Sequence, residues 1–258
     1  MKIYSFLLAF IMCSNGLAAQ PPKNTEYYLT KIYHCSDLQQ IAKIEKYLQK
    51  EMIPFLHNNG IQLTGVFTPL ANDTASDKQL YVWIPFTRLE MLASIEHRFG
   101  NLDPYGKSGL IHLDSMGSKA PYVRIETMLA EAFKKMKQHY PAVSFKRSPG
   151  NIYEFRSYES STENLHLRKV HMFNEGGEID LFKKLNFNAL FYARVIVGAH
   201  MPNLIYITRF TDIADRDEHW KKFGNSPDWK KMSSLAQYAS SVSKHEVVLL
   251  KASACSEF

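Results

Sequence analysis

Polar residues alternate with apolar ones in the segment Ile152–Tyr158, which reads IYEFRSY. In a strand, Glu154, Arg156 and Tyr158 share one face, because successive side chains point to opposite sides. The planar guanidinium of an arginine can donate two parallel hydrogen bonds to a carboxylate. This face is therefore a candidate site for a small-molecule or anionic ligand.

A related pattern occurs near the start of the chain, where Leu29, Lys31 and Tyr33 occupy the corresponding positions. Tyr206, on a later strand, completes the set. If the intervening apolar residues face covering helices, the candidates point into the space between two sheets. The alternative is that the charges only pair with one another inside a buried interface. The candidate ligand-binding residues are Lys31, Tyr33, Glu154, Arg156, Tyr158 and Tyr206.

The histidines do not follow a metal-binding pattern. His166 and His171 are five residues apart, which removes them from a common helical face, unlike the i, i+4 pair of zincins. His200 remains open as an axial haem ligand, but the sequence has no CxxCH haem-attachment motif. A nucleophile elbow, a P-loop and a dinucleotide fingerprint are also missing. We expect no metal and no cofactor, and leave open whether the protein is an enzyme.

The first residues resemble a secretory signal peptide. Lys2 precedes the apolar run Ile3–Met12, and Gly16–Ala19 offers small residues for cleavage. We therefore expect residues 1–19 to be removed and the mature protein to be periplasmic or extracellular. A cytoplasmic N-terminal helix is the alternative.

Composition restricts the partners. The net charge is +6 over 258 residues, but Lys and Arg are mixed with acidic residues rather than clustered, which argues against nucleic-acid binding. After the signal peptide, no apolar run is long enough to span a membrane. Removal of the signal peptide takes Cys13 with it, and Cys35 and Cys255 remain, whose pairing the sequence does not determine.

The two halves of the chain show the same order of expected elements. In the first half these are a strand at Glu26–His34, a helix from Leu38 to about Asn58 capped by Asp37, strands at Ile61–Phe67 and Leu80–Phe86, a helix at Leu89–Phe99, a strand at Tyr122–Leu129 and helical residues Ala130–Tyr140. In the second half they are strands at Ile152–Tyr158, Leu190–Val197, Leu204–Phe210 and His245–Lys251, with helices from Thr162 and from Ile213.

Matching aromatic and aliphatic positions support an internal repeat. An offset of 124 residues pairs Leu80 with Leu204 and Phe86 with Phe210, and an offset of 125 pairs Tyr33 with Tyr158. We therefore predict an α+β fold of two tandem ferredoxin-like β-α-β-β-α-β units. Their expected bounds are 26–145 and 151–252.

The helices of each such unit cover one face of its sheet and leave the other face open. Two sheets in one chain can bury their open faces against each other. The expected result is an intramolecular α/β-barrel pseudo-dimer, in which the two antiparallel sheets face each other. In the second unit, Gly176 and Gly177 interrupt the helical pattern, either as a kink or as an opening beside Asn174 and Glu178.

The chain resembles the NIPSNAP family, in particular its exported bacterial members with two tandem domains. The matching segments are YEFRSYES, KVHMFNEGGEIDLF (Lys169–Phe182), GAHMPNLIYITRF (Gly198–Phe210) and SPDWKKM (Ser226–Met232). The resemblance implies a dimeric α/β-barrel fold and says little about activity. Many members carry a His-x-Trp-x-Tyr alternation where this chain has Tyr206, Thr208 and Phe210.

We therefore expect an exported NIPSNAP-domain protein that acts in binding or as a scaffold and uses the space between the two sheets. The alternative is a cofactor-poor α/β-barrel enzyme, monooxygenase-like or isomerase-like, that acts on a small organic substrate. The expected partner is a small or anionic molecule and not a nucleic acid. The oligomeric state stays open, and a homo-oligomer is compatible with this fold.

Overall fold

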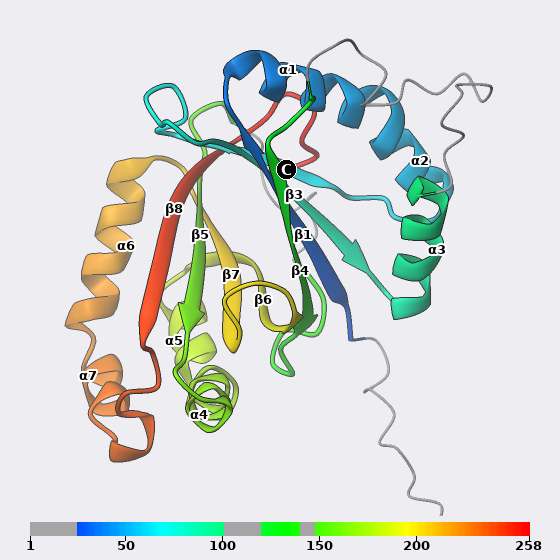
Figure 1. The fold of residues 1–258 in the computed structure, drawn as a ribbon. Helices are drawn as coiled ribbons and strands as arrows, with labels where there is room; N and C mark the ends of the chain where they lie inside the picture. Colours follow the sequence, from blue (N-terminus) through cyan, green and yellow to red (C-terminus); the bar gives the residue numbers. More distant parts are fainter. Residues whose placement is uncertain (1–24, 101–119, 140–147) are drawn as a thin grey trace, which may run out of the picture.

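The computed structural model describes residues 25–100, 120–139 and 148–258 (Figure 1). Its centre is a closed antiparallel barrel with the strand order β1-β3-β2-β8-β5-β7-β6-β4. The predicted α+β class and the closure into a barrel are confirmed. The strands are β1 (Tyr27–Cys35), β2 (Gly65–Pro69), β3 (Lys78–Phe86), β4 (Arg124–Ala132), β5 (Ile152–Glu159), β6 (Asn188–Val197), β7 (Asn203–Phe210) and β8 (Lys244–Ala252).

Each half of the chain supplies four neighbouring strands of the barrel. The first half has the order β4-β1-β3-β2 and the second half has the order β8-β5-β7-β6. Two seams join the halves. At one seam β2 pairs with β8, with Thr68 opposite Lys251, and at the other β4 pairs with β6, with Ala130 opposite Val195. Closure pairs the strands at both seams and leaves no free sheet edge there.

The helices lie outside the barrel, with α1 to α3 on one side and α4 to α7 on the other (Figure 1). Their bounds are α1 (Leu38–Tyr47), α2 (Ile53–Asn58), α3 (Leu89–Gly100), α4 (Glu163–Asn174), α5 (Glu178–Lys184), α6 (Ile213–Asn225) and α7 (Pro227–Ser233). None of the helices in the described residues is both long and apolar enough to cross a membrane.

Local sequence explains where the helices start and break. The side chains of Asp37, Thr162 and Asp212 each accept a hydrogen bond from a backbone N–H of the first helical turn. The helix expected from Leu38 to Asn58 is divided by a π-helical turn at Leu48–Met52, just before Pro54. Gly177, with φ +99°, separates α4 from α5, as the two adjacent glycines predict.

Three apolar cores hold the layers together. One fills the barrel interior with side chains from both halves, so that the ring of Trp83 stacks on Phe191 with centroids 5.1 Å apart. The second lies between the first-half strands and α1 to α3, and the third between the second-half strands and α4 to α7. Most of the strands are thus buried on both faces, whereas β8 is largely exposed over its first half.

The prediction of a helix at Ala130–Tyr140 is wrong for the described residues of this range. Strand β4 continues to Ala132, and residues 133–139 form no helix. Ala130 lies opposite Tyr28 of β1, and Ala132 lies opposite Ala193 of β6. These ladders close the barrel, and they override the helical preference of the Ala- and Glu-rich sequence.

The cysteines of the described region form no disulfide with each other. Cys35 is a buried free thiol, and Cys255 Sγ lies 3.4 Å from Ser253 Oγ. Burial, together with the nearby carboxylates of Asp37 and Asp77, raises the pKa of the Cys35 thiol to about 11. The thiol therefore stays protonated and weakly nucleophilic near neutral pH.

Candidate functional site

The expected direction of the second-half candidates is wrong. Tyr153 and Phe155 belong to the barrel interior, whereas Glu154, Arg156 and Tyr158 face outward beneath the helices. Because side chains alternate along a strand, the two sets must lie on opposite faces. Alternation does not say which face is the interior one, because both faces of this strand are buried. The apolar set occupies the interior, and the polar set meets polar partners supplied by the helices.

Glu154 is the centre of this outer network. Its carboxylate is fully buried and accepts hydrogen bonds from Arg156 Nε, from Arg216 Nε at 2.5 Å and from Trp220 Nε1 at 3.0 Å. The Arg156 guanidinium lies over the Trp220 ring, 3.7 Å from its centroid, and donates from Nη1 to the Tyr158 hydroxyl at 2.9 Å. A buried carboxylate needs such partners, because an uncompensated charge in the interior is costly.

Tyr206 extends the same network. Its hydroxyl lies 2.9 Å from the Tyr158 hydroxyl, and its side chain is fully buried. Burial raises the pKa of Tyr206 well above its ordinary value, and the neighbouring Tyr158 adds to this rise. The second-half candidates are thus brought together, but their contacts are with one another and with the helices.

Lys31 and Tyr33 lie apart from that network. Both are on the outward face of β1, in the helix layer of the first half. Lys31 borders a groove of about 280 Å³ that it shares with Leu92 and Val197, among others. The structure therefore separates the two halves of the predicted binding set.

A different group of residues lies at one end of the barrel interior. On five strands the inward-facing row changes from apolar to polar at this same end. A cavity of about 70 Å³ remains there. We call it the barrel-end pocket; its lining consists of Ile32, His34, Gln79, Tyr81, Glu126, Met128, Phe155, Ser157, His200 and Glu246.

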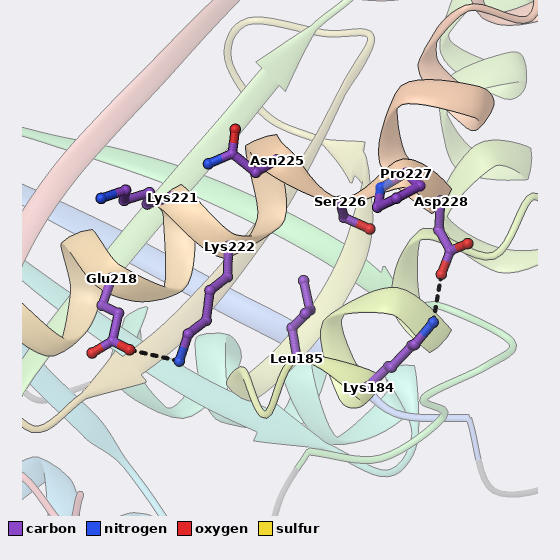
Figure 2. A pocket seen from close by; sticks show the side chains of 9 residues that line it. All are labelled: Lys184, Leu185, Glu218, Lys221, Lys222, Asn225, Ser226, Pro227 and Asp228. Atoms are coloured by element: carbon purple, nitrogen blue, oxygen red, sulfur yellow. Dashed lines mark hydrogen bonds and ion pairs between the residues drawn. The ribbon is translucent and has the colours of Figure 1, made fainter.

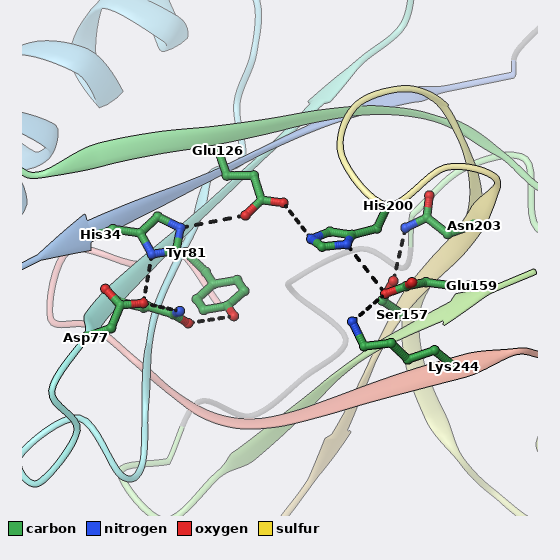
Figure 3. A network of polar contacts seen from close by, with 10 residues as sticks. His34, Asp77, Tyr81, Glu126, Ser157, Glu159, His200, Asn203 and Lys244 are labelled. Carbon is green, nitrogen blue, oxygen red and sulfur yellow. Dashed lines mark hydrogen bonds and ion pairs between the residues drawn. The ribbon is translucent and has the colours of Figure 1, made fainter.

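Two imidazoles flank one carboxylate in the barrel-end pocket (Figure 3). His34 Nε2 lies 3.6 Å from Glu126 Oε2, and His200 Nε2 lies 3.4 Å from Glu126 Oε1. The other ring nitrogens face Asp77 at 2.8 Å and Glu159 at 3.6 Å. The separations from Glu126 are long for direct hydrogen bonds, so these groups retain capacity for a further partner.

The remaining polar groups of the pocket are held in place by neighbours. The Tyr81 hydroxyl donates to Gln79 Oε1 at 2.9 Å, and Gln79 Nε2 donates to Asp77 Oδ2 at 2.8 Å. Burial raises the pKa of the Tyr81 phenol, and the carboxylates of Glu246, Glu126 and Asp77 raise it further. The phenol is therefore neutral and acts as a hydrogen-bonding group, and the pocket has a negative field.

His200 reaches the pocket from the turn between β6 and β7. Its backbone has φ +61°, a left-handed conformation that costs a non-glycine residue about 1–2 kcal/mol. The preceding Gly198 has φ +156°, and a Cβ there would come within 2.9 Å of the Met128 side chain. The turn thus packs closely on β4 and carries the imidazole over the pocket. Strained residues of this kind concentrate at functional sites.

Sequence reasoning did not single out this pocket, although it considered His200 for haem. A signal was present, because on four strands a polar residue stands two positions from an inward apolar one. These pairs are Ile32-x-His34, Glu126-x-Met128, Phe155-x-Ser157 and Glu246-x-Val248. Only the strand order shows that these pairs meet at one end. Among the described residues, no group of His, Cys, Asp and Glu has the geometry of a metal site.

A larger groove lies outside the barrel between α5, α6 and α7 (Figure 2). It has a volume of about 630 Å³, and its lysines are largely committed to neighbours. Lys184 pairs with Asp228 at 2.7 Å and Lys222 with Glu218 at 2.6 Å, all on exposed side chains. Exposed pairs of this kind contribute little and mark a solvated surface.

Comparison with known proteins identifies the second half. Residues 153–257 match the NIPSNAP family model. The chain carries a NIPSNAP domain. This domain spans β5 to β8 and contributes Phe155, Ser157, His200 and Glu246 to the barrel-end pocket. No curated protein matches the chain by sequence.

Solved structures resemble nearly the whole chain, including the half that precedes the NIPSNAP domain. A monooxygenase-like protein from Lactobacillus acidophilus NCFM has a TM-score of 0.53 and 10% identity, with 88% of this chain and 94% of that chain covered. An anthrone oxidase-like protein has a TM-score of 0.52 and 10% identity, with 89% and 92% covered. A monooxygenase-like protein from Fusobacterium nucleatum has a TM-score of 0.52 and 10% identity, with 88% of this chain and 92% of that chain covered. At this identity the similarity shows a shared fold alone.

Proposed function

We propose that the protein binds a small polar molecule in the barrel-end pocket. The observation that carries this proposal is the convergence of two imidazoles and two carboxylates on one cavity at the end of the barrel interior. A cavity with a few convergent polar groups at a barrel mouth is a common form of ligand site. The sequence-based idea of binding between the sheets is thereby narrowed to one end of the interior.

The packing of the interior supports this narrower location. Phe67 and Tyr153 are in contact with ring centroids 4.9 Å apart, and Tyr28 and Phe191 are 4.7 Å apart. Rings from both halves therefore fill the middle of the barrel. The pocket of about 70 Å³ is much smaller than the ~300 Å³ or more of a typical drug-sized site, which favours a small ligand or one end of a longer one.

A second candidate is a cofactor-poor enzyme that acts on a small substrate at the same place. Glu126 between His34 and His200 provides groups that can accept and return a proton. The monooxygenase-like and anthrone oxidase-like names of the similar structures agree with this alternative. A tricyclic substrate such as anthrone is too large for the pocket as it stands.

Screening small polar molecules by protein NMR tests both candidates. Ligands of the wild type are expected to shift resonances at the pocket and to lose binding in Ser157→Leu, whose side chain fills the cavity. Ser234→Leu, on the exposed end of α7, is the matched control and is expected to bind normally. His200→Ala serves if Ser157→Leu does not fold, since His200 is exposed.

Mass spectrometry of the recovered ligand separates binding from catalysis. An unchanged ligand supports the binding function, and a converted one supports the enzyme. Hits that bind equally to wild type and to both pocket variants would refute a site at the barrel end.

We also propose that the two halves are tandem ferredoxin-like units. Each half has the strand order expected of that unit, and the strand registers correspond. Tyr33 lies opposite Leu80 in the first half, and Tyr158 lies opposite Leu204 in the second. These are the pairs related by the offsets of 125 and 124 residues in the sequence.

We propose further that the protein is exported. The apolar run Ile3–Met12 after Lys2 supports this proposal, and it lies outside the described residues. N-terminal sequencing of the protein from its native host is expected to begin near Ala19 or Gln20. An intact Met1 would contradict export through this segment.

A further inference from the structure

We infer that the ligand of the barrel-end pocket is a small protonated amine that also carries a hydroxyl or carbonyl oxygen. This inference rests on the proposed function and specifies its ligand class. It differs from the anionic ligand expected from the sequence, because the residues that form the site are different. Three features of the pocket carry it: its charge, its aromatic wall and one buried hydroxyl.

The charged groups of the pocket favour a cation. Glu126 and Glu246 line the cavity, and among the described residues that line it none is Lys or Arg. Asp77 and Glu159 stand behind the two imidazoles and add negative charge. Lys244 is nearby, but its ammonium pairs with Glu159 at 3.1 Å (Figure 3). An ammonium between Glu126 and Glu246 would form charge-assisted hydrogen bonds.

The wall of the pocket suits the same group. Tyr81 and Phe155 both line it, with ring centroids 5.5 Å apart, and both side chains are buried. The face of an aromatic ring attracts a cation, most strongly where water is excluded. Carboxylates and aromatic rings together recognise organic ammonium groups better than they recognise neutral or anionic molecules.

Ser157 adds the requirement for an oxygen on the ligand. Its side chain lines the cavity with only 4% exposure. Its Oγ accepts a hydrogen bond from Asn203 Nδ2 at 3.0 Å, and no described residue accepts the hydroxyl proton. A buried donor without an acceptor is unfavourable, and a ligand oxygen would satisfy it.

The size of the cavity limits how much of the ligand is enclosed. A volume of about 70 Å³ holds about two water molecules at their liquid volume, and so only a few non-hydrogen atoms. His200 and Glu246 are exposed and form the outer rim. A short amino alcohol fits inside, and a longer amine would extend past this rim.

Four probes of nearly equal size test the inference by NMR titration of the full chain. Ethanolamine carries an ammonium and a hydroxyl, ethylamine lacks the hydroxyl, ethylene glycol is neutral and glycolate is an anion. All four probes are titrated at one pH, at which both amines are protonated. Ethanolamine is expected to bind most tightly, followed by ethylamine, with ethylene glycol and glycolate weaker.

Variants connect the preference to the pocket. Glu126→Gln and the exposed Glu246→Gln are each expected to weaken ethanolamine binding by about tenfold, since each removes one charge-assisted hydrogen bond. Ser157→Ala is expected to remove the preference for ethanolamine over ethylamine. Glu218→Gln, on the outer face of α6, is the matched control and is expected to have no effect.

The outcomes separate this inference from the proposed function. Glycolate that binds as tightly as ethanolamine, and whose binding is lost in the cavity-filling Ser157→Leu, would overturn the inference and leave a ligand site in place. No binding of either amine would also overturn it. Amine binding that is equally weakened by Glu218→Gln would place the effect on general surface charge and overturn the inference.

Discussion

At the scale of single residues, Arg156 shows how a charge is kept inside the protein. Its side chain has 14% exposure and lies between the Glu154 carboxylate, the Tyr158 hydroxyl and the Trp220 ring. Each contact comes from a different position, so the guanidinium is held in one orientation. Such a group acts as a structural tie between β5 and α6.

Arg156→Met is expected to lower the free energy of unfolding by about 3 kcal/mol, the lower end of the cost of breaking a buried pair. In this mutant Glu154 still accepts hydrogen bonds from Arg216 and Trp220, and this limits the loss of stability. Denaturant melts measure it. The control is Arg194→Met, since Arg194 forms an exposed pair with Glu131 at 2.6 Å and is expected to contribute less than about 1 kcal/mol.

A mutant as stable as the wild type would contradict the structural role of Arg156. Melts with added acetate provide the second comparison. If Arg156 binds an anion, acetate stabilises the wild type and not the mutant, and the loss of stability without acetate is small.

At the scale of elements, the turn between α4 and α5 brings a buried ion pair together. Lys169 of α4 meets Glu178 of α5 at 2.9 Å, and both side chains are buried. Burial raises the pKa of the Glu178 carboxyl, while Lys169 and Arg156 oppose the rise. The turn at Gly176 and Gly177 brings the pair together, because a straight helix could not place them so.

Gly177→Ala is expected to lower stability by about 1–2 kcal/mol, because Gly177 has φ +99°, where an L-residue is strained. Gly224→Ala is the matched control. Gly224 lies within α6 with no atom within 4 Å of the added Cβ, and alanine there is expected to stabilise by about 0.5–1 kcal/mol. Thermal melts that showed the same sign for both variants would contradict this account of the turn.

At the scale of the whole molecule, each half depends on the other for its interior. Trp83 of the first half packs on Phe191 of the second, and Phe67 packs on Tyr153. A fragment of residues 151–258 would expose its half of these rings. We expect it to be unstable or to dimerise through that face, as sedimentation and thermal melts can show. A stable monomeric fragment would contradict the shared interior.

Most strands were predictable because they alternate or are rich in β-branched and aromatic residues, but β2, expected at Ile61–Phe67, lies at Gly65–Pro69. β5 was expected at Ile152–Tyr158 and lies at Ile152–Glu159. Which face points inward was not predictable, because both faces are buried and Glu154 takes its partners from a helix about sixty residues later. The barrel-end pocket was hidden for a similar reason. Its residues come from five strands and a turn, and only barrel closure places His34 near His200 through Glu126.

The seam between β2 and β8 has a consequence for how the chain folds in time. Thr68 pairs with Lys251, so β2, from the first third of the chain, cannot complete its pairing until β8 has been synthesised. Until then β2 exposes backbone groups that can pair with another chain. Contacts so distant in sequence slow folding and lengthen this exposed period. A ribosome or a translocase that releases the chain from its N-terminus therefore delivers an open half-barrel first, and a chaperone that shields β2 would shorten its exposure.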